Sequence, residues 1–442
     1  MNVVILGAGS IGIKIAKQLS IMEYNISIVD KSPQRIKYIS DKIDVKHVVG
    51  HACDINTLKE AGIEKADIVI AMTPYDSVNI LACQIASQSF KTETKIAKIN
   101  NSLYCRNGTT TSGYIDFVVS FDQEILEIVK HGMYIRNALS VFKVKNALII
   151  TTVCKNNAPI LSGLYTQDIQ VYDLISIIDI KRNKVHQEKT SINDIQPGDE
   201  ITFCVDTTNK QEAMKLFGYD DNNKNTVIIG GGYISKAINS INIENTINIK
   251  IIEDDLNTAN ILSEKTNIDI IHGNPMNFDV LDESCVKDSV VVAMTKDDKA
   301  NILSGLYAKK AGASYVSVLL HDIGHVRLTD KLDFSSILDA KSSIVNKIIG
   351  YIHKQDKCNI TSINERDLIS IDIKRNSYFA GMKILEIESE YKIRVVTLIR
   401  SGAQISFSKN YITNNGDTII VLVKKNKTKN IISLAASRPE YL

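Results

Sequence analysis

The sequence predicts an α/β protein with two Rossmann-like, doubly wound parallel-sheet domains, each followed by a small α+β lobe. Short apolar runs alternate with helical patterns through two stretches of the chain, as expected for parallel βαβ units. A glycine-rich turn follows the first apolar run of each stretch. The second half of the chain also repeats the first half in order, which indicates that one two-lobed unit has been duplicated.

The composition is that of a folded globular protein. Of the 442 residues, 44% are hydrophobic and 23% are charged, so there is enough apolar surface to offset the entropy lost on folding. The 52 Lys and Arg residues against 50 Asp and Glu leave a formal net charge of +2. This neutral balance argues against a nucleic-acid partner.

The cysteines and the apolar runs indicate the compartment. The seven cysteines are odd in number, widely spaced and without a C-x-x-C pair, which disfavours a disulfide framework and a zinc site. No apolar run approaches the roughly 20 residues that span a bilayer. The first residues also lack the basic and apolar regions of a signal peptide. We therefore expect a cytoplasmic protein that serves any membrane process from outside the bilayer.

The duplication rests on ordered matches at a nearly constant offset. The segment from Val4 to Gly12 recurs from Val227 to Ser235, an offset of 223 residues. The same offset takes Asp30 to Glu253, and one residue is lost farther along, so that the offset becomes 222. Matches at this many ordered positions are hard to attribute to chance.

The regions between the large lobes repeat as well. An offset of 218 carries Arg182 to Arg400 and Gly198 to Gly416. We predict four lobes: large lobe 1 at residues 1–140, small lobe 1 at 141–221, large lobe 2 at 222–356 and small lobe 2 at 357–442.

The elements of large lobe 1 follow from hydrophobic periodicity. Residues 2–6 form an apolar run that ends directly at the glycine-rich turn, which indicates a strand. Ile11, Ile15 and Leu19 then recur at helical spacing, and residues 26–30 form a second strand that ends in an acid. Further strands are expected at 45–49, 66–71, 95–99 and 117–120, and a helix at 76–89.

Large lobe 2 and the small lobes are assigned in the same way. Strands of large lobe 2 are expected at 227–229, 249–253, 268–272, 289–293 and 315–319. The small lobes are β-rich, with strands expected at 171–181, 200–205, 370–374, 395–400 and 418–423. Turn-forming residues at 197–199 and 414–417 precede the last strand of each small lobe.

The glycine-rich turn of large lobe 1 matches a dinucleotide-binding fingerprint. Gly7, Gly9 and Gly12 follow a strand and open a helix, and Asp30 ends the second strand eighteen residues beyond Gly12. Gly7 permits the tight turn, Gly9 lets a pyrophosphate approach the backbone, and Gly12 lets the helix pack on the strand. The helix N-terminus offers N–H groups to the phosphates. The other interpretation is a loop kept for packing alone.

Asp30 indicates which dinucleotide is favoured. Its carboxylate can accept hydrogen bonds from the hydroxyls of the adenosine ribose. The same charge would repel the 2′-phosphate of NADP, so NAD(H) is favoured.

Polar residues follow the fourth strand of each large lobe. Thr73 and Thr295 lie just past that strand, at the edge of the sheet where ligands bind. Asp76 and Asp298 come three residues later, and each can either cap the next helix or face a ribose or a metal-bound phosphate.

Three further residues are candidates for ligand contact. His51 and its counterpart Asn274 follow the third strand and can hydrogen-bond an adenine edge, although a plain loop position is equally open. Lys98 ends the fifth strand and can either neutralise a phosphate or point into solvent.

The glycine motif is incomplete in large lobe 2. Gly230 and Gly232 persist and Glu253 holds the acid position, but Ser235 replaces the third glycine. Nucleotide binding and a structural pseudo-site are therefore both open for this lobe.

The sequence shows no acid–base group placed for hydride transfer. The eight histidines do not pair with acids in a repeated pattern. His321 and His325 lie four residues apart after a strand, and without an evident third ligand we interpret them as a surface loop rather than a metal site. We predict neither catalytic residues nor a metal.

Together these motifs resemble the TrkA family, the peripheral regulatory subunit of bacterial Trk potassium uptake. Its lobes have the RCK or KTN nucleotide-binding fold and the TrkA-C fold, and the resemblance covers essentially the whole chain. It rests on residues 4–12, 29–30, 49–52, 58–62 and 66–67, on Thr73 with Asp76 and Asn79, and on residues 295–301.

The resemblance implies two nucleotide regions. In large lobe 1 the implied contacts are Gly7, Ala8, Gly9, Ser10, Ile11, Asp30, Thr73, Pro74 and Lys98. In large lobe 2 they are Gly230, Gly231, Gly232, Tyr233, Ile234, Glu253 and Asn274. The ligand would be NAD(H), with ATP or ADP as alternatives. This chain departs from the family at Lys98, usually Arg, at Phe121, commonly Pro, and at Ser235 and Asn274 in place of a glycine and an acid.

The resemblance also implies a partner and a location. The chain would form a homo-oligomeric ring, a dimer or a tetramer, peripheral to the inner face of the cell membrane. It would lie beneath a membrane-embedded potassium transporter subunit of the TrkH/TrkG type. Nucleotide occupancy would shift the ring between conformations, so the protein would be a non-catalytic regulator. The alternatives are an NAD-dependent oxidoreductase of a small metabolite and an NAD-binding module for another cation transporter or channel.

Overall fold

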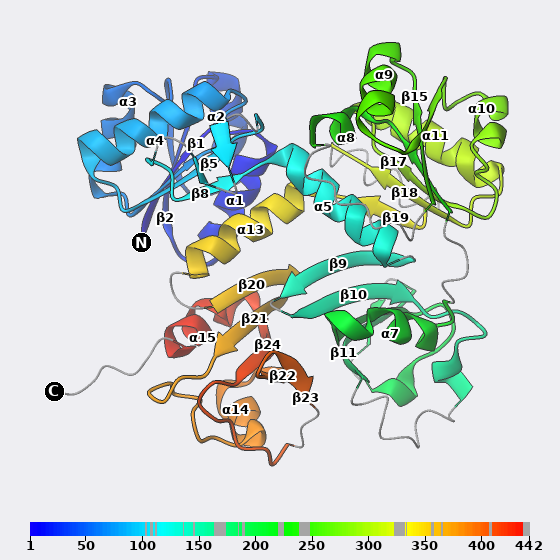
Figure 1. Cartoon of the computed structure of the whole chain (residues 1–442). Coiled ribbons are helices and arrows are strands. Elements are labelled where there is room, and N and C mark those ends of the chain that lie inside the picture. The colour runs from blue at the N-terminus through cyan, green and yellow to red at the C-terminus, as the bar shows by residue number, and fades with distance from the viewer. Residues whose placement is uncertain are drawn as a thin grey trace.

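The chain forms two tiers in a computed structural model, with two large lobes side by side above two small lobes (Figure 1). The structure describes residues 1–435 except for 102–103, 107–108, 111–112, 136, 145, 163–173, 184, 188–190, 220–224, 238–247, 322–331, 333, 355–357, 364–365 and 406–408.

Large lobe 1 contains a six-stranded sheet of order β3-β2-β1-β4-β5-β8, parallel throughout. Its strands are β1 (Asn2–Leu6), β2 (Asn25–Asp30), β3 (Lys46–Val49), β4 (Ile68–Ala71), β5 (Thr94–Lys98) and β8 (Phe117–Val119). Its helices are α1 (Ser10–Ile21), α2 (Pro33–Ser40), α3 (Ile55–Glu60) and α4 (Asp76–Phe90), and β6 (Cys105–Arg106) and β7 (Thr109–Thr110) form a separate hairpin. The predicted doubly wound sheet is confirmed.

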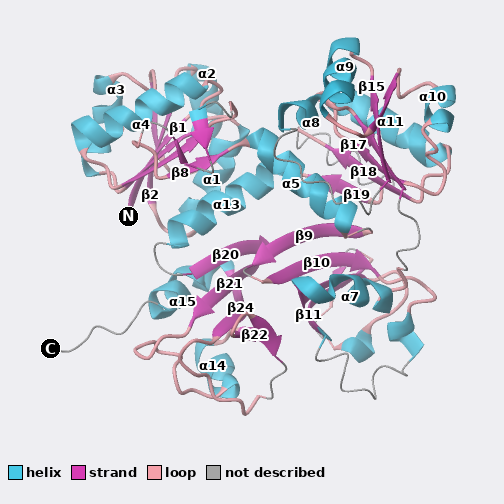
Figure 2. Ribbon diagram, in the orientation of Figure 1, coloured by secondary structure: helices cyan, strands magenta, loops and turns pink. Residues whose placement is uncertain are grey.

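The central strand β1 explains why this lobe forms a three-layer structure. Val3 and Ile5 face one hydrophobic cluster, and Val4 and Leu6 face another, so the strand is apolar at every position. Helices cover both faces of the sheet (Figure 2).

Large lobe 2 repeats the arrangement, with the parallel order β16-β15-β14-β17-β18-β19. The strands are β14 (Asn225–Ile229), β15 (Asn248–Glu253), β16 (Asp269–His272), β17 (Val290–Ala293), β18 (Tyr315–Leu319) and β19 (Ser336–Leu338). The helices are α8 (Gly232–Ala237), α9 (Leu256–Lys265), α10 (Phe278–Glu283) and α11 (Asp298–Lys310). Strand β19 was not predicted.

The two large lobes exchange helices. Helix α5 (Phe121–Tyr134) follows the last strand of large lobe 1, yet its Ile125 and Val129 belong to the core around Ile228 of large lobe 2. Helix α13 (Ala340–Lys354) follows large lobe 2, and its Ile348 belongs to the core around Ile5 of large lobe 1. The two helices approach each other between the lobes in Figure 1.

Polar contacts fix the position of both helices. The ammonium of Lys14 on α1 lies 3.1 Å from the carboxylate of Asp339 and 2.8 Å from the hydroxyl of Ser342 at the start of α13. Glu124 on α5 accepts from the hydroxyl of Ser343 and pairs with Lys347, both on α13. Each exchanged helix is therefore held by charge as well as by apolar packing.

The small lobes are antiparallel sheets with short helices, as predicted. Small lobe 1 has the order β12-β11-β13-β10-β9 and small lobe 2 the order β20-β21-β24-β22-β23. The strands of small lobe 1 are β9 (Ala138–Val144), β10 (Ala147–Val153), β11 (Ile175–Arg182), β12 (Val185–His186) and β13 (Glu200–Asp206), with helix α7 (Lys210–Leu216). Those of small lobe 2 are β20 (Cys358–Ile363), β21 (Arg366–Asp372), β22 (Arg394–Arg400), β23 (Ala403–Ile405) and β24 (Thr418–Lys424), with α14 (Ile384–Tyr391) and α15 (Thr428–Ala435).

Several boundaries in the small lobes differ from expectation. The strand expected at 370–374 ends at Asp372, because the chain turns there, and the start of the strand expected at 171–181 lies outside the described residues. The hairpin of β9 and β10 was not predicted. The lobe boundary expected at residue 140 falls inside β9, which begins at Ala138, and the division into lobes remains a proposal.

The same ion pair recurs in both small lobes. Arg182 binds Asp199 through two nitrogens at 2.8 Å, and Arg400 binds Asp417 at 2.8 and 3.0 Å. Burial alone would raise the pKa of Asp199, but hydrogen bonds from Arg182 and from a backbone N–H outweigh it and lower that pKa. The repeat read at an offset of 218 thus corresponds to a repeated structural contact.

The small lobes also pack on each other. Ile149 and Cys204 of small lobe 1 share a cluster with Leu368 and Ile420 of small lobe 2. Arg394 donates to the backbone oxygens of residues 177 and 178 across this interface.

Within the described part of the chain, no helix has both the length and the apolarity needed to cross a bilayer.

We predict that Ile348→Ala destabilises large lobe 1 rather than large lobe 2, although α13 follows large lobe 2 in the chain. Ile348 is fully buried, and removing its side chain from a core should cost about 3 kcal/mol. Amide hydrogen exchange should therefore rise in β1 and α1. Ile261→Ala on α9, where the side chain is 41% exposed, is the control. Faster exchange confined to large lobe 2 would contradict the helix exchange.

Candidate functional site

A cavity of about 560 Å³ opens at the carboxyl edge of the sheet in large lobe 1. This size is within the range of small-molecule sites. It lies where the strand order reverses between β2-β1 and β4-β5, the usual ligand position in doubly wound sheets. Its lining consists of Gly7, Gly9, Ser10, Ile11, Val29, Asp30, Lys31, Arg35, Gly50, His51, Ala52, Met72, Thr73, Pro74, Tyr75, Val78 and Lys98.

The three glycines of the turn each meet a different steric demand. Gly7 has φ +111°, and a Cβ there would lie 2.9 Å from the backbone oxygen of Met72. A Cβ on Gly12 would lie 2.1 Å from the oxygen of Gly7, so only glycine lets α1 approach the strand. A Cβ on Gly9 would meet no atom within 4 Å. Because Gly9 also lines the cavity, its backbone is open to a ligand.

Helix α1 points its N-terminus into the cavity. Gly9 is the N-cap and provides no side-chain acceptor, and the first two helical residues, Ser10 and Ile11, line the cavity. The N–H groups of this first turn need an acceptor from elsewhere. A phosphate would satisfy them and would also be favoured by the helix dipole.

Asp30 braces the glycine turn from the end of β2. One carboxylate oxygen accepts from the backbone N–H of Ala8 at 2.7 Å, and the other accepts from Ser32 at 2.9 Å. The guanidinium of Arg35 lies 3.6 Å from the first oxygen. Each carboxylate oxygen can accept a second hydrogen bond, so a ribose hydroxyl can still be received.

The loop after β4 is held by an amide. The buried Asn79 accepts from both the backbone N–H and the hydroxyl of Thr73, at 2.9 and 2.6 Å. Its NH₂ group donates to the backbone oxygens of Thr73 and of Lys98, at 3.1 and 2.8 Å. Asn79 therefore fixes the ends of β4 and β5 at the cavity.

Lys98 lines the cavity from the end of β5. Burial lowers its pKa, while the negative charges of Asp76 and Asp122 act to raise it. An anionic group bound in the cavity would further favour the charged ammonium.

Asp76 has a role that the sequence analysis did not offer. It accepts from the backbone N–H groups of Asn100 and Asn101 at 3.0 and 2.9 Å. The N-cap of α4 is Tyr75, so of the two roles considered for Asp76 the capping role is wrong. Asp76, Ala8 and Gly12 are the candidates of large lobe 1 that support the cavity without lining it.

The remaining candidates line the cavity. Pro74 follows Thr73 at the rim. The imidazole of His51 is exposed, and its Nδ1 accepts from the backbone N–H of Cys53 at 3.2 Å. Lys31, Arg35 and Tyr75 line the cavity as well, and the sequence analysis missed them because no motif marks those positions.

Large lobe 2 keeps the supporting contacts. Gly230 has φ +95°, Glu253 accepts from the backbone N–H of Gly231 at 2.6 Å, and Thr295 is held by Asn301 at 2.7 Å. Burial raises the pKa of Glu253, and the nearby Asp254 adds to this effect.

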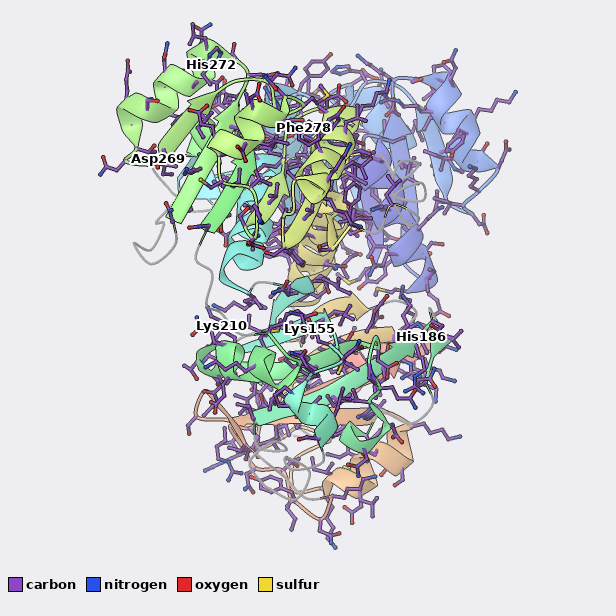
Figure 3. All side chains as sticks on the ribbon, turned by 90° about the vertical axis from the view of Figure 1, so that its right-hand side faces the viewer. Lys155, His186, Lys210, Asp269, His272 and Phe278 are labelled. Carbon is purple, nitrogen blue, oxygen red and sulfur yellow. The ribbon has the colours of Figure 1, made fainter. Side chains whose placement is uncertain are left out.

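Figure 3 labels both ends of β16, and His272 at its carboxyl end lies near the top of the view, away from the small lobes.

The turn of large lobe 2 is engaged with other side chains. The Tyr233 hydroxyl lies 2.9 Å from Nε2 of His321, and the other ring nitrogen lies 2.6 Å from Asp298. Tyr233 is buried among apolar side chains that include Ile125 and Leu126 of α5. His321 lies in the loop after β18, as expected, but its ring is half-buried and hydrogen-bonded rather than free at the surface. His325 lies outside the described residues.

Other elements of this edge also differ from large lobe 1. Asp297 is the N-cap of α11, so Asp298 does not cap that helix. Ile234 is buried beside Tyr233, and the Asn274 side chain accepts from the backbone N–H of Met276 at 2.9 Å. No group of side chains suited to a metal ion occurs among the residues the structure describes.

Comparison with known proteins gives one consistent result. The sequence profile of the TrkA-N domain matches residues 3–120 and 226–339. The Trk system potassium uptake protein TrkA of Azorhizobium caulinodans is 28% identical over 98% of this chain and 98% of its own length. The protein of the same name from Haemophilus influenzae is 27% identical over 97% and 96%.

Solved structures show the same fold. The GsuK RCK domain aligns with a TM-score of 0.58 at 15% identity, covering 99% of this chain and 95% of that one. The GsuK channel bound to NAD aligns with the same TM-score and identity, covering 99% and 79%. Because two copies of the family profile occupy more than half of the sequence and the fold agrees, the chain belongs to the TrkA family.

Proposed function

We propose that this chain is a cytoplasmic, nucleotide-binding regulatory subunit that controls a membrane potassium-uptake transporter. Its full-length relatives are named Trk system potassium uptake proteins, and they match the chain from end to end. The partner would be a membrane-embedded subunit of the TrkH/TrkG type, contacted from the inner face of the membrane. The chain would act as a dimer or tetramer.

The cavity of large lobe 1 is the observation that carries the proposal. It combines an open backbone at Gly9, a helix N-terminus without a side-chain cap, a carboxylate at Asp30 and a cation at Lys98. The open backbone, the helix N-terminus and the cation suit phosphates. The carboxylate suits a ribose. NAD(H) fits this set, and ATP or ADP would use the same adenosine and phosphate positions. A protein of this fold, the GsuK channel, has been solved with NAD bound.

Large lobe 2 is the second candidate region. Its glycine turn and acid are in place, but Tyr233 and His321 occupy the edge where Ser10 and the loop after β5 stand in large lobe 1. We propose that large lobe 1 is the stronger nucleotide site. The contacts at Gly230 to Ile234, Glu253, Asn274 and Thr295 remain predictions for the second.

Regulation rather than catalysis is the role these features support. Two ionisable side chains of the cavity have binding or supporting roles: Asp30 braces the glycine turn, and Lys98 supplies a positive charge within the electrostatic influence of Asp76. The exchanged helix α13 also contacts α1, whose N-terminus faces the cavity. A ligand that moves α1 would therefore act on the neighbouring lobe, as a regulator requires.

Gly9→Asp should abolish nucleotide binding without unfolding the lobe. A Cβ at this position would meet no protein atom within 4 Å, so the backbone tolerates a side chain there, and the carboxylate would place a negative charge in the phosphate position. In cells with the membrane subunit but without their own regulatory subunit, the unaltered chain should change potassium uptake. The Gly9→Asp chain should not, as measured by rubidium flux.

Gly232→Asp is the matched control in large lobe 2. A Cβ on Gly232 would have only the Lys296 side chain within reach, at 4.0 Å, so the backbone tolerates a side chain there too. Binding of NADH to large lobe 1 should survive this change in a calorimetric titration. Equal uptake with and without the unaltered chain would refute the proposed regulatory role.

Asp30→Ala should weaken NADH binding by about tenfold or more. A charge-assisted hydrogen bond contributes roughly 1.5–3 kcal/mol, and the change also removes the brace on the Ala8 N–H. Calorimetric titration measures the affinity, and Glu253→Ala in large lobe 2 serves as the comparison. An unaltered affinity for the Asp30→Ala chain would show that the carboxylate has no part in binding.

A further inference from the structure

Two side chains without a predicted role face each other across the mouth of the cavity in large lobe 1. Lys31 follows Asp30 at the end of β2, and Tyr75 lies two residues past Thr73 at the end of β4. The sheet order β2-β1-β4 puts these ends on opposite sides of the glycine turn. The ammonium of Lys31 lies 5.6 Å from the centroid of the Tyr75 ring, and both residues line the cavity.

The position of this pair corresponds to the adenosine half of a bound nucleotide. Asp30, next to Lys31, is the ribose acceptor of the proposed site, and the glycine turn receives the phosphates. His51 and Ala52 line the cavity from the loop after β3, the strand next to β2. The base must then lie between the loops that carry Lys31 and Tyr75.

Tyr75 occupies its position at a local disadvantage. It is the N-cap of α4 and makes no side-chain capping bond, and the residue is 57% exposed. Aspartate or serine is strongly preferred at an N-cap. The equivalent residue in large lobe 2, Asp297, caps α11 by accepting from the backbone N–H of Lys299 at 2.8 Å. A residue that goes against the N-cap preference at the mouth of a ligand cavity indicates a functional role for its side chain.

The pair is confined to large lobe 1. The established offsets of 223 and 222 take Lys31 to Asp254 and Tyr75 to Asp297. Large lobe 2 thus has two carboxylates where large lobe 1 has a cation and an aromatic ring. Neither carboxylate can stack on a base, and both would repel phosphates.

We propose that Lys31 and Tyr75 form a clasp that closes on the adenine ring and makes large lobe 1 selective for adenine nucleotides. The clasp rests on the proposed nucleotide-binding function of the cavity. Without ligand, the two side chains meet across the mouth. With ligand, the base stacks on Tyr75 and lies beneath the ammonium of Lys31, which attracts its π-face. A ring between them needs about 7 Å, twice a van der Waals contact of ~3.5 Å, so the pair must separate slightly.

A purine gains more from this clasp than a pyrimidine does. The larger adenine ring system overlaps Tyr75 more fully, whereas ribose and phosphate contacts are the same for ADP and UDP. The ratio of ADP affinity to UDP affinity therefore reports on the clasp, and the absolute affinities report on the rest of the site.

Calorimetric titration of the full chain with ADP, UDP and NADH tests the clasp. Tyr75→Ala should weaken ADP and NADH by the same factor of about five- to tenfold, since base–aromatic stacking has this order of effect. The UDP affinity of Tyr75→Ala should change by less than about twofold. Lys31→Ala should also lower the ADP affinity, by a smaller factor than Tyr75→Ala does. Tyr75→Phe keeps the ring and should bind as the unaltered chain does. Asp297→Ala in large lobe 2 is the matched control and should leave ADP affinity unchanged.

Tyr75→Asp separates binding from folding. Aspartate restores the missing cap of α4, so the midpoint of thermal unfolding should rise while ADP affinity falls. Loss of ADP and UDP affinity by equal factors in Tyr75→Ala would overturn the clasp, as would unchanged ADP affinity in both Tyr75→Ala and Tyr75→Asp. If the unaltered chain binds none of the three nucleotides, the proposed nucleotide-binding function fails together with the clasp.

Discussion

Neither large lobe completes its own hydrophobic core, and the rest of the architecture depends on this constraint. The face of the first sheet around Val3 and Ile5 is covered by Ile344 and Ile348 of a helix that begins after the last strand of the second sheet. The corresponding face of the second sheet is covered by α5, which begins after the last strand of the first. Separating the lobes would therefore expose both cores at once. Each large apolar side chain exposed in this way would cost roughly 1.5–3 kcal/mol. The duplication is therefore an obligate pair.

The exchanged helices also connect the cavity with the small lobes. Helix α1 starts at the glycine turn, and its Lys14, one turn farther along, holds Asp339 and Ser342 at the start of α13. Burial would raise the pKa of Asp339, but its hydrogen bonds from Ser342 and the charge of Lys14 lower it, so the pair favours the ionised carboxylate. The chain passes from α13 into β20 of small lobe 2 after three residues. A shift of α1 on ligand binding would therefore reach α13 through packed and charged contacts, and α13 directly precedes small lobe 2 in the chain.

The sequence was sufficient for the parts of the structure that depend on local pattern. Alternating apolar runs predicted the parallel sheets, and the glycine spacing predicted where the cavity lies, because both follow from short-range geometry. The exchange of α5 and α13 was not predictable, since the apolar faces of these helices are the same whichever lobe they cover. The role of Asp76 was missed for a similar reason: its partners, the N–H groups of Asn100 and Asn101, are set by how β5 ends. Lys31 and Tyr75 carry no motif, and only the fold brings them face to face.

The differences between the two lobes follow from what each must do within an obligate pair. Both keep the residues that hold the carboxyl edge together, Asn79 with Thr73 in one and Asn301 with Thr295 in the other, because the sheet needs them whether or not a ligand binds. They diverge where a ligand would be touched. In large lobe 1 the turn residue Ser10 is exposed, whereas its counterpart Tyr233 is buried against α5 and hydrogen-bonded to His321. A turn anchored to the partner lobe in this way is suited to transmit a change, and a turn left open is suited to receive a ligand. Because the unit is duplicated, large lobe 1 can keep its turn open for a ligand while large lobe 2 anchors its turn to transmit the change. Two identical lobes could not divide these tasks.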